Sequence, residues 1–242
     1  ALPLDQCTTI EVGPGPGGLT RSLLKNHASL TVIEMDDRFI SPLNELAKSY
    51  NNLTVIHDNA LRVDLAKIAE KNIKLVSNLP YNVGTKLLIN WLLSEPLFWS
   101  KAVLMFQKEV AQRITANPND KAYGRLAILT QSICSAQIAF DVPAMAFTPP
   151  PKVDSAVVVF EPLPIEKRFK HLKILGEVTM ATFSQRRKML RGSLKSITKK
   201  YGTTPLKLCE LAEINPEFRP ENLSIIDFQN LALNLKEKTN HQ

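Results

Sequence analysis

Residues 8–24 read TTIEVGPGPGGLTRSLL, and this stretch carries the clearest structural signal in the chain. Its first five residues form a short β-branched and largely apolar run that stops at a glycine cluster, as a buried strand does at a turn. The residues from Leu19 to Leu24 then have helical spacing. A strand, a tight turn and a helix in this order open a doubly wound α/β sheet.

The same alternation continues downstream. The pattern predicts strands at 30–34, 53–56, 74–77 and 102–106, and helices through 43–47, 65–69, 84–93, 109–114 and 126–133. Two β-rich runs follow at 137–142 and 156–160, and a proline-rich connector at 148–152 separates them. Because proline is tolerated at sheet edges, we expect these two runs to form an antiparallel pair at the edge of the sheet.

The pattern changes after residues 161–164, which read EPLP and which we interpret as a linker. Only helical segments are predicted beyond it, at 172–183, 188–199, 205–213 and 224–235. The sequence therefore predicts two domains. Residues 1–162 form a Rossmann-like α/β domain with a mostly parallel sheet and antiparallel edge strands, and residues 163–242 form a small all-helical domain.

The positive charge is concentrated in the second predicted domain. Residues 1–162 contain 15 Lys and Arg against 15 Asp and Glu, whereas residues 163–242 contain 15 against 8. That excess accounts for the whole net charge of +7. A neutral N-terminal part and a basic C-terminal part are typical of a protein whose C-terminal part contacts a polyanion. The same distribution is equally typical of a well-solvated helical surface.

The composition excludes several classes of protein. With 44% hydrophobic residues, 242 residues are ample for one large core or for a medium and a small domain. No apolar run approaches the roughly 20 residues that cross a bilayer. No charged and apolar leader precedes the first strand, so we expect a cytoplasmic protein. Cys7, Cys134 and Cys209 lie far apart, which favours free thiols and predicts no metal site.

The glycine cluster at 13–18 fits the pattern G-x-G-x-x-G, which alone is a weak signal. Glycines let the backbone turn sharply and approach a ligand, and the next helix offers free N–H groups. A dinucleotide dehydrogenase uses the same geometry for a pyrophosphate. Glu11 would oppose a pyrophosphate, but it suits the ammonium group of S-adenosylmethionine. We therefore assign Glu11, Gly13 and Gly15 to an S-adenosylmethionine site.

Further cofactor contacts are expected after the second and third strands. Glu34 ends the second strand, where a carboxylate can accept hydrogen bonds from both hydroxyls of a ribose. That placement serves NAD as well as S-adenosylmethionine. We add Met35, the next residue, and Asn78, which follows the fourth strand, to the expected cofactor contacts. After the third strand, Asp58, Asn59 and Ala60 offer a side-chain oxygen to the adenine amino group of the cofactor, unless Asp58 or Asn59 only caps the turn.

Asn78, Leu79, Pro80 and Tyr81 follow the fourth strand, at the edge where open α/β sheets bind ligands. The exocyclic amine of adenine is a poor nucleophile because its lone pair is delocalised into the ring. Two acceptors below its N–H bonds stabilise the positive charge that grows as a methyl group arrives. The Asn78 side-chain oxygen and the Leu79 carbonyl can be these acceptors, with Pro80 holding the carbonyl in place and Tyr81 stacking on the base. The alternative is a strand that ends in an Asn-Pro-type turn.

Four segments resemble the ribosomal RNA adenine dimethyltransferase family. They read EVGPG at 11–15, VIE at 32–34, NLPYN at 78–82 and FTPPPKVDS at 147–155, and FSQRRK at 183–188 is similar to the helical C-terminal domain of that family. The resemblance spans nearly the whole chain and is greatest to the bacterial small-subunit enzymes.

The resemblance implies a class I methyltransferase fold, S-adenosylmethionine as cofactor, and N6,N6-dimethylation of two adjacent adenosines. These adenosines lie in the hairpin near the 3′ end of 16S rRNA, and the small ribosomal subunit in late assembly is the expected partner. Phe147 by itself is more often a core aromatic, but the resemblance makes it a second stacking partner for the target base. It also implies cofactor contacts for Glu34 and the glycine loop.

Two features depart from the family pattern. The family has a segment with a Gly-Gln-(Asn/His)-Phe motif before the first strand, which covers the cofactor and touches RNA. This sequence begins only a few residues before that strand, so we expect the segment to be missing. The Asp-Ala pair of the family aligns with Asn59 and Ala60, which leaves open whether Asp58 or Asn59 contacts the cofactor adenine.

Basic residues cluster at the start of the predicted helix 188–199. Arg187, Arg191 and Lys195 recur at helical spacing, so we expect their charges on one helix face, which Arg186 and Lys188 widen. Such a face would contact RNA phosphates without reading sequence. The alternative is a solvated helix surface. Beside an adenine site, the cluster favours contact with ribosomal RNA, by a protein that we expect to be monomeric.

Three other functions stay open. A relative that methylates 23S rRNA and confers antibiotic resistance uses the same chemistry, and only the resemblance favours 16S rRNA. A non-catalytic RNA-binding assembly factor would keep the same fold. A nicotinamide oxidoreductase would use the glycine loop, but it leaves the segment at 78–81 without a role.

Overall fold

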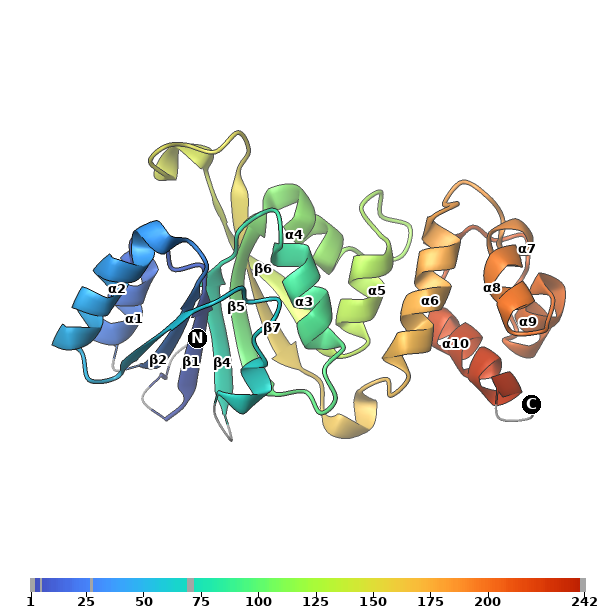
Figure 1. The fold of residues 1–242 in the computed structure, drawn as a ribbon. Coiled ribbons are helices and arrows are strands. Elements are labelled where there is room, and N and C mark those ends of the chain that lie inside the picture. Colours follow the sequence, from blue (N-terminus) through green and yellow to red (C-terminus); the bar gives the residue numbers. More distant parts are fainter. Residues whose placement is uncertain (1–2, 5, 27, 69–71, 240–242) are drawn as a thin grey trace. The chain divides into compact units, whose positions relative to one another are not determined.

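The structure, a computed structural model, describes residues 3–4, 6–26, 28–68 and 72–239 (Figure 1). The chain forms two compact units. The first comprises Ala1–Ala111 and Ala136–Pro162, and the second comprises Gln112–Ser135 and Leu163–Gln242. The break after Pro162 falls within the expected linker, and residues 112–135 group with the helical part of the chain.

The first unit is built on a seven-stranded sheet with the order β3-β2-β1-β4-β5-β7-β6. The strands are β1 (Thr8–Val12), β2 (Ser29–Glu34), β3 (Leu53–His57), β4 (Ile73–Asn78), β5 (Trp99–Gln107), β6 (Cys134–Val142) and β7 (Ser155–Pro162). The strands β1 to β5 pair in parallel, and β7 runs antiparallel to β5. This confirms the prediction of a mostly parallel sheet, with the β-rich runs after residue 134 at one edge.

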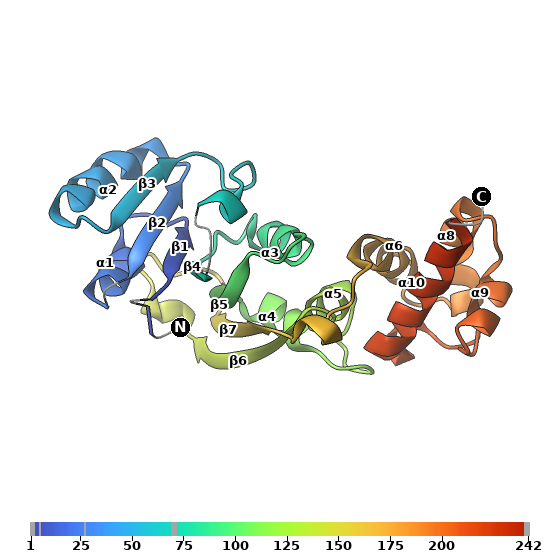
Figure 2. The same cartoon turned by 90° about the horizontal axis from the view of Figure 1, so that it is seen from below.

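The helices of the first unit cover both faces of this sheet (Figures 1 and 2). They are α1 (Gly18–Lys25), α2 (Asp37–Ser49) and α3 (Gly84–Leu92), with 3-10 turns η1 (Leu65–Lys67) and η2 (Ala144–Ala146), and α4 (Lys108–Thr115) runs on into the second unit. Leu23 of α1 and Leu43 of α2 join Leu30 and Val32 of β2 in one apolar core. Because side chains alternate along a strand, Ile33 points to the opposite face, where it lines a pocket together with Leu87 of α3.

One predicted helix of the first unit is wrong. Residues 65–67 form only a 3-10 turn, with Asp64 as its cap: the Asp64 carboxylate accepts a hydrogen bond from Ala66 N at 3.2 Å. A side-chain cap of this kind favours a short turn as readily as a helix. The last residue of the predicted segment, Ala69, lies outside the described residues.

The order of the strands reverses at β1. This strand pairs with β2 on one side and with β4 on the other, although β2 and β4 are separated in the sequence by β3. In an open parallel sheet, a ligand binds outside the carboxyl ends of the strands at such a reversal. Gly13, Met35 and Leu79 immediately follow the carboxyl ends of β1, β2 and β4, so the fold brings three predicted site segments to one place.

The second unit is largely helical. Its helices are α5 (Arg125–Gln131), α6 (Leu172–Phe183), α7 (Leu190–Ser193), α8 (Lys195–Lys200), α9 (Pro205–Leu211) and α10 (Ile225–Thr239), with 3-10 turns η3 (Ile165–Lys167) and η4 (Pro220–Asn222). The Phe183 ring packs between two buried aromatic rings, with centroids 6.2 Å from that of Tyr123 and 5.7 Å from that of Phe228. No helix in the described ranges is long and apolar enough to cross a membrane.

The continuous helix predicted at 188–199 is wrong. The chain turns between Ser184 and Met189, and then forms the short helices α7 and α8. The amide of Leu190 donates to Phe218 O at 2.8 Å, and the amide of Arg191 donates to Pro216 O at 3.0 Å. Because an amide bound to a distant carbonyl cannot continue a helix from the residues before it, these two bonds set the start of α7 at Leu190. The interruption between α7 and α8 is the turn at Leu194.

Candidate functional site

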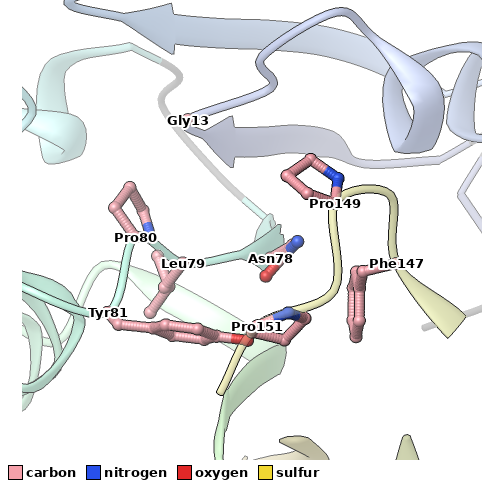
Figure 3. A pocket seen from close by; sticks show the side chains of 8 residues that line it. All are labelled: Gly13, Asn78, Leu79, Pro80, Tyr81, Phe147, Pro149 and Pro151. Carbon is pink, nitrogen blue, oxygen red and sulfur yellow. The ribbon is translucent and has the colours of Figure 1, made fainter. Parts of the chain in front are cut away.

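Two pockets meet at the carboxyl edge of the sheet in the first unit. The inner pocket has a volume of about 120 Å³ and lies over β1, β2 and the turn after β3. The outer pocket has a volume of about 290 Å³ and lies over the turn after β4 (Figure 3). Gly13 and Pro80 line both, so the two pockets adjoin. The inner pocket is lined by Val12, Gly13, Ile33, Glu34, Met35, Asp58, Asn59, Ala60, Leu61, Pro80, Asn82, Val83 and Leu87, and the outer one by Gly13, Asn78, Leu79, Pro80, Tyr81, Phe147, Pro149 and Pro151.

The glycine loop needs its glycines for two different reasons. Gly13 has a φ of +69°, and a Cβ there would lie 2.9 Å from the Pro80 Cγ atom. Gly15 also has a positive φ, +53°, but no atom lies within 4 Å of the position of its Cβ. Gly13 is therefore required by the close approach of Pro80, whereas Gly15 is required by backbone conformation alone.

Glu34 is held at the mouth of the glycine loop by three backbone amides. Its Oε2 atom accepts from Gly15 N at 3.1 Å, and its Oε1 atom accepts from Met35 N and Asp36 N at 2.8 Å each. A carboxylate has about four acceptor positions, so these bonds orient Glu34 and leave capacity for a ligand hydroxyl. Met35 is 64% exposed and lines the same pocket, as does Ala60.

Glu11 lies outside the set of residues that lines either pocket, although it stands two residues before Gly13. Its side chain is 1% exposed, and its Oε2 atom accepts a hydrogen bond from Thr20 Oγ1 at 2.7 Å. Burial raises the pKa of Glu11 to about 7; the Thr20 bond opposes this shift, and the nearby charge of Glu34 adds to it. Glu11 is thus a buried carboxyl that changes its charge close to neutral pH.

The turn after β3 distinguishes the two candidate acceptors that the sequence left open. The Asn59 Oδ1 atom accepts from Leu61 N at 2.9 Å, so it caps the turn. The Asp58 Oδ1 atom accepts from Asn59 N at 2.6 Å. No hydrogen bond to the second carboxylate oxygen of Asp58 occurs among the described residues. Asp58 therefore has one carboxylate oxygen without a partner among the described residues, whereas the single amide oxygen of Asn59 already accepts one bond.

The turn after β4 presents Asn78 and a main-chain carbonyl to the outer pocket. The Pro80 carbonyl accepts from Val83 N at 3.1 Å and from Gly84 N at 2.9 Å, which closes the turn into α3. The Leu79 side chain is buried and anchors the turn, whereas Asn78 is exposed. Within the described part of the chain, neither the side-chain amide of Asn78 nor the Leu79 carbonyl has a hydrogen-bond partner. Both predicted acceptors are thus available to a ligand.

Two aromatic rings approach the outer pocket from different sides (Figure 3). Tyr81 is 40% exposed, and its hydroxyl lies 2.7 Å from Ser155 Oγ. Phe147 is half-buried and follows η2, where its amide donates to Ala144 O at 3.2 Å. Asn78 lies between the rings in Figure 3. The structure therefore brings together all five residues that were predicted to hold a target base.

The basic cluster does not form one helix face. Arg187 and Lys188 lie in the turn before α7, Arg191 lies in α7 and Lys195 in α8. The Arg186 guanidinium donates to Glu221 Oε2 at 2.7 Å and to Lys121 O at 2.8 Å, whereas the Arg191 side chain forms a longer ion pair with Glu217, at 3.8 Å. The bonds of Arg186 connect three segments of the second unit, so Arg186 has a structural role that the spacing of charges did not reveal.

Several residues that the structure places in the site had no role assigned to them from the sequence. Ile33, Val83 and Leu87 form the apolar wall of the inner pocket, but as apolar residues in a strand and near a helix they look like ordinary core. Thr20 and Ser155 are buried hydroxyls that bind Glu11 and Tyr81. Their contacts with Glu11 and Tyr81 are visible only in the structure. Pro149 and Pro151 line the outer pocket and lie inside the segment 147–155 that carried the family resemblance.

The fold and the two pockets define a class of protein. A mostly parallel sheet ordered β3-β2-β1-β4-β5-β7-β6, with a glycine loop after β1 and a carboxylate after β2, belongs to the Rossmann-like class I methyltransferases. The chain belongs to the ribosomal RNA adenine dimethylase family, whose model matches residues 2–236. This confirms the resemblance that the motifs indicated.

Curated relatives with the name ribosomal RNA small subunit methyltransferase A are similar to nearly the whole chain. The protein of Maricaulis maris is 52% identical over 92% of this chain and 78% of its own length, and that of Caulobacter vibrioides is 49% identical over 93% and 85%.

Among solved structures, a dimethyladenosine transferase from Plasmodium falciparum matches with a TM-score of 0.80 and 28% identity, over 98% of this chain and 94% of that one. The 23S rRNA methyltransferase ErmE matches with a TM-score of 0.66 and 21% identity, over 96% and 92%, which shows a shared fold.

Proposed function

We propose that this protein dimethylates N6 of two adjacent adenosines in the 3′-terminal hairpin of 16S rRNA, with S-adenosylmethionine as methyl donor, during assembly of the small ribosomal subunit. The family and the name of the curated relatives support this reaction and this target. We further propose that the protein acts as a cytoplasmic monomer.

The inner pocket fits the nucleoside part of this cofactor. Glu34 is oriented by backbone amides and can accept hydrogen bonds from ribose hydroxyls. Ile33 and Leu87 supply apolar walls for a flat base, and Asp58 offers an acceptor to its amino group. Glu11, behind Gly13, supplies negative charge for the ammonium end. Bound there, S-adenosylmethionine supplies an electrophilic methyl group on a sulfonium.

The outer pocket fits the target adenine. Tyr81 and Phe147 hold the base by stacking, which is worth about 1–3 kcal/mol for each base. The Asn78 Oδ1 atom and the Leu79 carbonyl accept the two N–H bonds of N6. Both acceptors gain strength as positive charge develops on that nitrogen, so they stabilise the transition state more than the ground state. No strong general base is required, since the methylated ammonium loses its proton readily.

The adjacency of the two pockets is the observation that supports this function most directly. They share Gly13 and Pro80, so a methyl donor held by one faces a base held by the other. The second methylation needs no new acceptor, because the Leu79 carbonyl or Asn78 can still hold the remaining N–H bond. We propose that Arg187, Lys188, Arg191 and Lys195 contact phosphates of the same RNA, which would position it without reading its sequence.

Labelled methyl transfer tests the function. The protein is incubated with methyl-labelled S-adenosylmethionine and with small subunits that lack the modification, or with 23S rRNA, and the labelled nucleoside is identified. We expect dimethyladenosine in 16S rRNA alone, and almost no label with the Asn78→Ala protein in the same time. Label in 23S rRNA would assign the protein to the other target. RNA binding without any label would indicate an assembly factor instead.

A further inference from the structure

A hydrogen bond connects the Tyr81 loop to the antiparallel edge of the sheet. Tyr81 Oη and Ser155 Oγ lie 2.7 Å apart, a good distance for two hydroxyl groups. Ser155 is fully buried and is the first residue of β7, in register with Gln107 of β5. The preceding carbonyl, that of Asp154, accepts from Lys108 N at 2.9 Å. The sheet therefore fixes the backbone of Ser155, and its hydroxyl is a rigid anchor.

The Tyr81 ring lies in a turn and is partly open to solvent. Tyr81 lies in the turn between β4 and α3, and 40% of the residue is exposed. A tyrosine side chain rotates about two torsions, and in this turn one end of the ring is attached to the backbone. The bond to Ser155 holds the opposite end of the ring, the hydroxyl. Two fixed ends set the plane of the ring, and stacking on a base depends on that plane.

The same strand also leads to the other wall of the outer pocket. The segment that carries Phe147, Pro149 and Pro151 runs directly into β7 (Figure 3). The Asp154 carboxylate accepts from Ala144 N at 2.9 Å, which closes this segment at its base. Ser155 is thus the point where the wall that contains Phe147 and the wall that contains Tyr81 are joined. The spacing between the two rings depends on that junction.

We propose that Ser155 is a positioning residue for the target base. Its hydroxyl holds the Tyr81 ring in the plane that stacks on the adenine, at a set distance from Phe147. Ser155 itself does not touch the base, and it acts through Tyr81. This inference rests on the proposed function, because it assigns to the outer pocket the adenine that this function places there.

Two single substitutions remove the same hydrogen bond from its two ends. Ser155→Ala and Tyr81→Phe both keep the aromatic ring and lack the bond. We expect each to lower kcat/KM for unmethylated small subunits by about 3- to 10-fold, the factor that corresponds to one ordinary hydrogen bond. Most of the effect should appear in the KM for the RNA substrate. The dissociation constant of S-adenosylmethionine, measured by calorimetry, should stay within about twofold of that of the wild type, a difference of less than one hydrogen bond.

The double variant separates positioning from a general loss of structure. If Ser155 acts through Tyr81, Ser155→Ala with Tyr81→Phe should be no slower than either single variant, because one bond can be removed only once. Ser100→Ala is the matched control: its hydroxyl bonds to Ile73 O at 3.1 Å on the same sheet, away from both pockets, and the rate should not change.

If the decreases in kcat/KM of the two single variants multiply in the double variant, the role of Ser155 is overturned. An unchanged rate in either single variant would also overturn it. A wild-type protein that methylates no adenosine in 16S rRNA would overturn the proposed function instead, and the two failures are therefore distinguishable.

Discussion

The carboxylates around the inner pocket differ in what their surroundings let them do. Glu34 is surrounded by backbone N–H groups and presents an oriented charge to the pocket. Asp58 is exposed and uses one oxygen in its own turn. Glu11 lies in a buried site where Thr20 is its one side-chain hydrogen-bond partner among the described residues, so its charged form is disfavoured. The three carboxylates therefore differ in charge state and in the oxygens that they offer to a ligand. The role of each can be tested separately.

Asp58→Ala should weaken S-adenosylmethionine binding by about tenfold, because it removes a charged acceptor for the adenine amino group. Asn59→Ala should change this affinity little and lower the free energy of unfolding by about 1 kcal/mol, since its oxygen caps the turn. Calorimetry and chemical denaturation of both variants check the assignment. A larger loss of affinity in Asn59→Ala would reverse it.

Asn78→Ala should lower kcat by about 100- to 1,000-fold, the usual cost of one group that stabilises charge in a transition state. The cofactor affinity should remain close to that of the wild type, because the amide acts on the target nitrogen. Single-turnover kinetics and calorimetry measure the two effects. Asn26→Ala, the same change at the exposed end of α1, should be fully active. Normal methylation by Asn78→Ala would refute the acceptor role.

Glu11 should make the stability of the cofactor-free protein depend on pH. Its pKa in the folded state is about 7, above the value of 4.5 for an unperturbed glutamate. The unfolded chain therefore ionises first as the pH rises, and stability falls between about pH 4.5 and 7 by about 3 kcal/mol. Glu11→Gln should lack this decrease and be the more stable protein at about pH 8, above both pKa values, as denaturation at several pH values will show.

The same substitution should weaken cofactor binding in mildly alkaline solution. Ionised Glu11 favours the ammonium group of the ligand, so the affinity of the wild type should rise as the pH passes through about 7, and that of Glu11→Gln should rise less. Calorimetric titrations on both sides of this pH measure the two profiles. Equal pH profiles for the two proteins would exclude Glu11 from cofactor binding.

At the level of elements, the turn after β1 and the turn after β4 are packed against each other at one contact. Gly13 belongs to the first and Pro80 to the second, and the space between them excludes even a methyl group. The contact fixes the distance between the inner pocket, proposed for the methyl donor, and the outer pocket, proposed for the target base. It also explains why two segments far apart in the sequence form one site. A second bond joins the same two segments, because Ser77 Oγ donates to Val12 O at 2.6 Å.

Gly13→Ala should lower the free energy of unfolding by about 2–4 kcal/mol, since it combines a left-handed backbone with a steric clash against Pro80. Gly15→Ala is the control. It has the same backbone penalty, about 1–2 kcal/mol, but no atom lies within 4 Å of the new Cβ. Urea denaturation of the cofactor-free proteins compares them. Equal decreases for the two variants would show that the Pro80 contact does not affect stability.

Over the whole molecule, charge and chemistry are divided between the two units. Both pockets lie in the first unit, whereas the whole excess of positive charge lies in residues 163–242. Contacts between such a surface and RNA phosphates give an RNA affinity that depends on the salt concentration. The two pockets determine which atom of the RNA receives the methyl group. We therefore expect substitutions in the second unit to change RNA affinity without changing the chemical step.

Replacing Arg187, Lys188, Arg191 and Lys195 by glutamine should weaken binding to small subunits. It should also reduce the slope of log affinity against log salt by up to about 0.7–0.9 for each phosphate that the variant no longer neutralises. Arg186→Gln should instead lower the thermal stability, because the Arg186 guanidinium binds Glu221 and the Lys121 carbonyl.

Filter binding at several salt concentrations and thermal denaturation separate these two effects. An unchanged salt slope in the fourfold variant would remove these residues from the RNA surface. A fourfold variant that binds more weakly but transfers methyl groups at the wild-type rate in single turnovers would support the division between the two units.

Local spacing was sufficient for much of this protein. A run of β-branched residues followed by glycines predicts β1 and its turn, because strand, turn and helix propensities act over a few residues. The same reasoning located Glu34, Asp58 and Asn78 at strand ends, where a parallel sheet collects its ligands. The family pattern added Phe147, which spacing alone would have left in the core.

Tertiary packing decided what local spacing could not. Ser155 binds Tyr81 across 74 residues, Pro80 requires a glycine at position 13, and bonds to Pro216 and Phe218 fix the start of α7 at Leu190. Asp58 and Asn59 both line the inner pocket, and only the structure shows that the Asn59 oxygen caps the turn while one Asp58 oxygen has no partner among the described residues. Each of these results depends on contacts that form only in the folded protein. The periodicity of residues along the chain does not reveal such contacts.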